Sequence, residues 1–141
     1  MTYREFKQAA KKHYKTSKCL YERCDKDDWQ IQENIFYLCG YVIEMMIKYQ
    51  IYRRINHPID KDIRQIDKST GLTYSNHINK HNINILVRTL EKYENIALFK
   101  DIKEVFKNWD VAVRYNGKRK HYTNLEEFLE LSKKLIEKFE G

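Results

Sequence analysis

A basic and aromatic segment between residues 109 and 123 carries the residue types best suited to contact a phosphate-containing partner. Its cations and aromatic residues are Arg114, Tyr115, Lys118, Arg119, Lys120, His121 and Tyr122. Cations attract phosphates and aromatic rings stack on bases, so this mixture is typical of a surface that binds RNA or a nucleotide. A basic surface loop without a specific partner is the alternative that the same residues allow.

The segment lacks the spacing of a helix. Asn116-Gly117 is a signal for a two-residue β-hairpin turn, and apolar and polar residues alternate on both sides of it. We therefore expect either an irregular loop or a small hairpin at this place.

A second group of cations follows helical spacing near the N-terminus. The row consists of Arg4, Lys7, Lys11, Lys15 and Lys18. Glu5 is the only acidic residue before residue 22. Such a row is either an ordinary solvated face or a stripe that contacts phosphates. The second interpretation makes Lys7, Lys11 and Lys15 additional RNA or nucleotide contacts.

The composition limits the class of protein. A chain of 141 residues that is 42% hydrophobic fits one domain, 1–141, with a real core. The net charge of +7 and the pI near 9.2 favour an anionic partner. We expect a cytoplasmic protein without a membrane partner, since charges interrupt every window of spanning length and no secretory leader is present.

The three cysteines, Cys19, Cys24 and Cys39, are odd in number and are expected to be reduced thiols. The C-x4-C spacing of the first two is poor evidence for zinc. We therefore predict no metal and no cofactor.

Residues 29–54 are predicted to form the central helix, because apolar residues cover most of its circumference at helical spacing. Such a helix must be covered on several sides. Only a narrow seam is polar or amphipathic, and it includes Glu44 and Lys48, a favourable pair four residues apart. Gly40 lowers the helix propensity, which indicates close approach by a neighbouring helix.

Five further helices and one loop complete the predicted organisation. A capped N-terminal helix begins at Thr2-Tyr-Arg-Glu5, a short helix lies around 59–66, a loop follows at 69–77, and further helices lie at 78–93, 96–109 and 123–139. These segments predict an all-α fold, an up-and-down bundle of four main helices plus a short extra helix.

Three motifs in this order resemble the HEPN domains of prokaryotic conflict and nucleotidyltransferase-linked systems. They are Gly40-Tyr-Val-Ile-Glu44-Met-Met-Ile-Lys48, His81-Asn-Ile83-Asn-Ile-Leu86 and Trp109-Asp-Val-Ala-Val-Arg114-Tyr115. The first is similar to the family's helix with a small residue followed by Glu and Lys. The second is similar to its His-x-Leu-x-x-Leu helix start, and the third to its Trp…Arg-Tyr segment before the final helix. The insertion at 58–76 is longer than the family pattern.

The resemblance implies a homodimeric module of a toxin–antitoxin or defence system that binds RNA or a nucleotide, with a nucleotidyltransferase or an antitoxin as its partner protein. Many members are metal-independent endoribonucleases that carry Arg, four to six residues, then His before the final helix. Arg114 and His121, with six residues between them, match this catalytic pair.

In that chemistry, His121 would act as general base or acid for attack by a 2′-hydroxyl, and Arg114 would stabilise charge on the phosphate. Tyr115 departs from the nuclease pattern, which has a polar residue after Arg, and Arg114-Tyr115 also resembles non-catalytic members. Three functions therefore follow from the sequence, in order: a binding module, an endoribonuclease and a structural helical adaptor.

Overall fold

The computed structural model describes residues 1–109 and 122–140. Over these residues the chain forms α1 (Arg4–Arg23), α2 (Trp29–Arg54), α3 (Ile83–Glu91), α4 (Leu98–Val105) and α5 (Leu125–Glu140). The described part contains no strand, and the predicted all-α bundle is confirmed. The predicted loop or hairpin at 110–121 lies outside the described residues.

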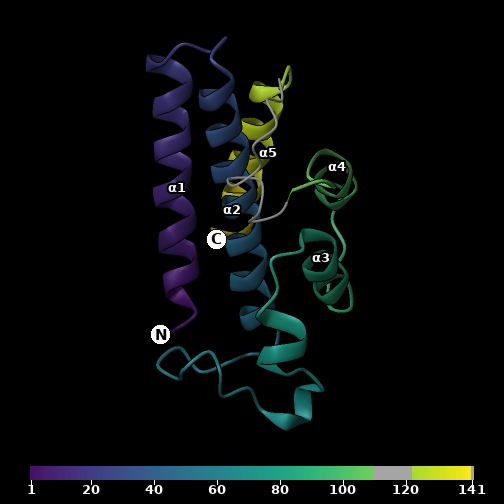
Figure 1. Ribbon diagram of the computed structural model, residues 1–141. Coiled ribbons are helices and arrows are strands. Elements are labelled where there is room, and N and C mark those ends of the chain that lie inside the picture. The colour runs from purple at the N-terminus through teal and green to yellow at the C-terminus, as the bar shows by residue number, and fades with distance from the viewer. Residues whose placement is uncertain (110–121, 141) are drawn as a thin grey trace.

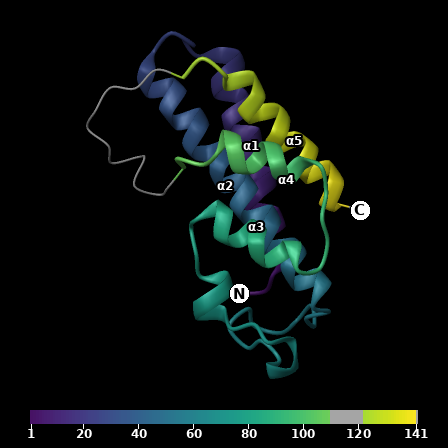
Figure 2. The ribbon, with the colours of Figure 1, turned by 90° about the vertical axis from the view of Figure 1, so that its right-hand side faces the viewer.

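Helix α2 is the centre of the bundle, as Figure 1 shows. It begins after Asp28, whose side chain accepts a hydrogen bond from the backbone N–H of Gln30 and so caps the helix. Helix α1 lies antiparallel beside α2, and α5 packs against both helices. Figure 2 shows α3 and α4 on one side of α2, where α4 also packs against α5. The apolar circumference of α2 is thus covered from several directions, as its sequence requires.

Aromatic rings join three of these helices in the core. The ring of Phe36 on α2 stacks on Phe106, with centroids 5.8 Å apart, and lies 4.8 Å from the ring of Phe128 on α5. Phe106 follows the last residue of α4, so this contact also fixes the end of that helix. The buried side chains of all five helices belong to one continuous cluster.

The predicted short helix around 59–66 is wrong, because that stretch forms a series of turns. Asp62 and Asp67 explain the difference. The side chain of each accepts a hydrogen bond from the backbone N–H two residues further on, at Arg64 and Ser69 respectively. These local bonds offer the backbone a partner that competes with a helix. Regular structure in this connection is limited to a 3-10 turn at Lys68–Thr70 and a π-helical turn at Tyr74–Ile78.

The third long helix begins later than predicted, at Ile83 in place of residue 78. Asn82 sets this start, since its side-chain oxygen accepts the backbone N–H of Ile85. The preceding loop is fastened to the end of α2 by Tyr52, whose hydroxyl donates to the carbonyl oxygen of Ile63 at 2.5 Å.

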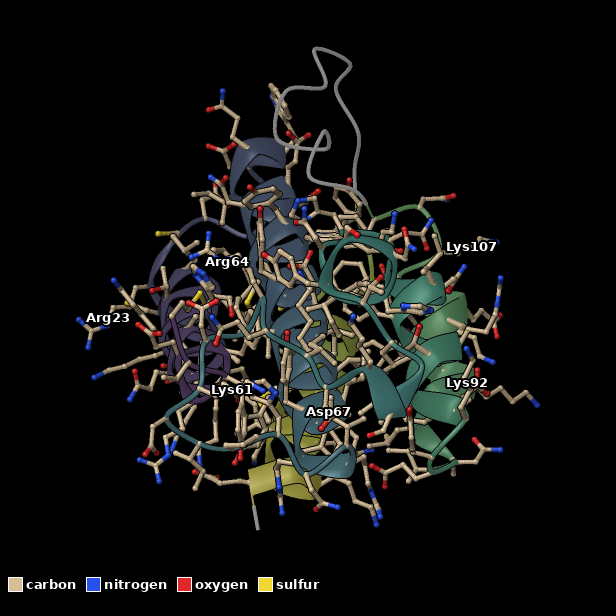
Figure 3. The ribbon with its side chains drawn as sticks, turned by 90° about the horizontal axis from the view of Figure 1, so that it is seen from below. Arg23, Lys61, Arg64, Asp67, Lys92 and Lys107 are labelled. Carbon is tan, nitrogen blue, oxygen red and sulfur yellow. The ribbon has the colours of Figure 1, made fainter. Side chains whose placement is uncertain are left out.

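Positive side chains lie on several faces of the bundle. In Figure 3, seen from the loop end, Arg23 of α1 lies on one side and Lys92 and Lys107 lie on the opposite side. Lys61 and Arg64 belong to the connecting loop between them. The net charge therefore does not by itself locate a binding site. No described helix combines the length and apolar character that crossing a membrane requires.

A charged network fastens the turn after α3 to the end of α2. Arg54 donates to both carboxylate oxygens of Glu94, at 3.0 and 2.7 Å, and Gln50 donates to one of them at 2.6 Å. Burial acts to raise the pKa of Glu94, but the hydrogen bonds from Arg54 and Gln50 outweigh it and hold the pKa below its usual range.

We predict that Glu94→Gln lowers the free energy of unfolding by about 1–2 kcal/mol at neutral pH, since it weakens charge-assisted hydrogen bonds. The folded pKa lies below the unfolded value, so this contribution is complete above the unfolded pKa and is lost as the pH falls through the folded pKa. Urea unfolding followed by circular dichroism, from about pH 7 down to about pH 3, should show the difference from wild type shrinking.

Glu91→Gln is the matched control, because Glu91 pairs with Lys103 at 3.2 Å on the surface. It should change stability by less than about 0.5 kcal/mol. A Glu94→Gln deficit that is independent of pH would contradict the proposed charge contribution.

Candidate nucleic-acid interface

Trp109 directly precedes the basic segment, and its side chain is anchored on α2. The indole is buried, and its Nε1 donates to the carbonyl oxygen of Tyr37 at 3.1 Å. The ring lies directly over Gly40, where an added Cβ would sit only 1.9 Å from Nε1. The sequence indicated that Gly40 admits a neighbouring helix, but the structure places the side chain of Trp109 there. The glycine is thus a notch for one indole ring.

Tyr122 directly follows the basic segment and is anchored on the same helix. Its backbone N–H donates to the side-chain oxygen of Gln32 at 2.9 Å, and its ring stacks on Phe36 with centroids 4.8 Å apart. The amide nitrogen of Gln32 in turn donates to the carbonyl oxygen of Lys26 at 2.8 Å. Burial, followed by the charge of Glu33, raises the pKa of Tyr122. Gln32 is a site residue that the sequence did not single out.

The two anchors lie close together along α2. Gln32 and Gly40 are eight residues apart, which corresponds to about 12 Å along a helix. The first half of α2 therefore holds both ends of the chain that carries the predicted site. The predicted catalytic and binding residues themselves, Arg114, Tyr115, Lys118, Arg119, Lys120 and His121, lie outside the described residues.

The basic row of α1 is partly engaged in contacts within the molecule. Lys11 forms an ion pair with Glu140 at the end of α5, and this bond lowers the pKa of Glu140. The ammonium group of Lys7 lies over the ring of Tyr49, 5.4 Å from its centroid. Lys15 has an exposed side chain. A phosphate bound to this row would have to compete with the carboxylate of Glu140.

The structure separates Lys11 of this row from the anchor of the basic segment at Tyr122. Lys11 lies at Glu140, the last residue of α5, whereas Tyr122 precedes the start of α5 at Leu125. Helix α5 has 16 residues, so its two ends lie about 22 Å apart. Lys11 and the anchor at Tyr122 therefore lie near opposite ends of α5, and a joint role of the basic row and the basic segment in binding stays a prediction.

A charged cluster occupies the seam of α2, one turn beyond Gly40. Lys48 donates to Oε2 of Glu44 at 3.2 Å, which confirms the predicted pair. The seam was predicted to be polar or amphipathic, but the side chains of Glu44 and Lys48 are only 0% and 6% exposed. The other carboxylate oxygen, Oε1, lies 3.0 Å from Nδ1 of His81. Helical spacing in the sequence identifies the Glu44–Lys48 pair, but no local pattern identifies His81 as its third member.

The three cysteines lie in different environments. Burial raises the pKa of the Cys39 thiol to about 11, against the effect of hydrogen bonds with Ser132 and Ser17. Cys19 and Cys24 are exposed free thiols. Residues 1–109 and 122–140 contain no group of three or more side chains arranged to hold a metal ion.

We predict that Gly40→Ala lowers the free energy of unfolding by about 1–3 kcal/mol, because the new methyl group collides with the indole of Trp109. The intrinsic helix propensity of alanine acts in the opposite direction by about 1 kcal/mol. In a Trp109→Ala background the same substitution should therefore be neutral or stabilising. A double-mutant cycle measured by urea unfolding tests this reversal of sign. Equal destabilisation in both backgrounds would show that the indole is not the group that requires glycine.

Comparisons of this chain with protein-family models, curated proteins and solved structures give no match. The resemblance to HEPN domains therefore stays a prediction that depends on the three motifs. The helical fold and the two anchors on α2 are established by the structure independently of it.

Proposed function

We propose that this protein binds single-stranded RNA or a nucleotide through the basic segment 110–121, as a HEPN-like module. The observation that carries the proposal is the anchoring of Trp109 and Tyr122 on neighbouring turns of α2. This arrangement supports the proposal because it commits a buried indole, a partly buried tyrosine ring and a buried glutamine to holding the ends of one short segment.

The composition of that segment supplies the chemistry. Four Lys or Arg residues stand between the anchors, together with a histidine and a tyrosine, against the single acidic residue Asp110. Lysine and arginine attract phosphates through charge, and a planar ring contributes stacking that tolerates any base. These residue types suit a short polyanion better than an apolar small molecule.

The salt dependence of binding tests the location of the contacts. A Lys118→Gln/Arg119→Gln/Lys120→Gln variant should flatten the log–log salt dependence of affinity for a labelled single-stranded RNA by about 2, since each lost contact removes about 0.7. Fluorescence anisotropy at several salt concentrations gives this slope. A Lys7→Gln/Lys11→Gln/Lys15→Gln variant should have a smaller effect, because Lys11 is already paired with Glu140.

Lys133→Gln/Lys134→Gln/Lys138→Gln is the matched control, since it removes three charges from the outer face of α5. Its slope should equal that of the wild type. If all three variants flatten the slope equally, binding is diffuse attraction to a basic protein. If the wild type ignores RNA and nucleotides at physiological salt, the structural adaptor becomes the better description.

A metal-independent endoribonuclease is the second candidate, favoured by the position of Arg114 and His121 directly before α5. Under this hypothesis the protein cuts single-stranded RNA in excess EDTA, leaving a 5′-hydroxyl on one product and a cyclic phosphate on the other. His121→Ala should lower the rate by about 10²–10⁴-fold and preserve RNA binding, because it removes only the proton carrier.

Arg114→Ala should lose activity and part of the affinity. Binding without any cutting, or cutting that survives in His121→Ala, would exclude this mechanism and leave the binding module. The resemblance also implies a homodimer with a nucleotidyltransferase or antitoxin partner. A strict monomer in light scattering at high concentration would count against an active site shared by two subunits.

A further inference from the structure

We draw no further inference here: the strongest candidate, the groove between α1 and α5 lined by Tyr14, Leu129 and Ile136, has an apolar floor that the bundle itself already largely buries, and nothing in the structure shows what covers it.

Discussion

Trp109 can lie against α2 only because residue 40 has no side chain, and much of the arrangement depends on that contact. The indole joins the end of the α4 region to the middle of α2 and fixes where the chain leaves the described bundle. Its hydrogen bond to the carbonyl oxygen of Tyr37 satisfies the one polar atom that a buried indole carries. Glycine reduces the helix propensity of α2 by about 1 kcal/mol, and burial of a large aromatic side chain more than offsets this loss.

Helix α2 also carries charged side chains at buried positions, where apolar side chains would pack more simply. Glu44 and Lys48 lie inside the bundle, and their bonds are completed by His81 from the start of α3. A helix surrounded on several sides has few positions from which a charged group can reach water. The half-exposed imidazole of His81 connects this buried cluster to the surface. Gly40 and Glu44 stand on successive turns, so α2 carries both the contact with Trp109 and the buried charged cluster.

The sequence predicts the parts of the fold that depend on regular spacing. Helices α1, α2 and α5 follow from apolar periodicity, and the Glu44–Lys48 pair follows from a four-residue interval. It does not predict structure that depends on competition between local and regular hydrogen bonds. Three isoleucines at helical spacing favoured a helix around 59–66, but Asp62 and Asp67 bond to nearby backbone N–H groups and form turns. Contacts between distant segments, such as Gln32 with Tyr122 or Glu44 with His81, leave no local pattern at all.

The proposed binding through the basic segment depends on the solution conditions. Attraction between cations and phosphates acts over a Debye length and weakens as salt is added, so it brings a polyanion to the surface without identifying it. Selectivity between polyanions must therefore come from contacts that act at short range, where salt screens little.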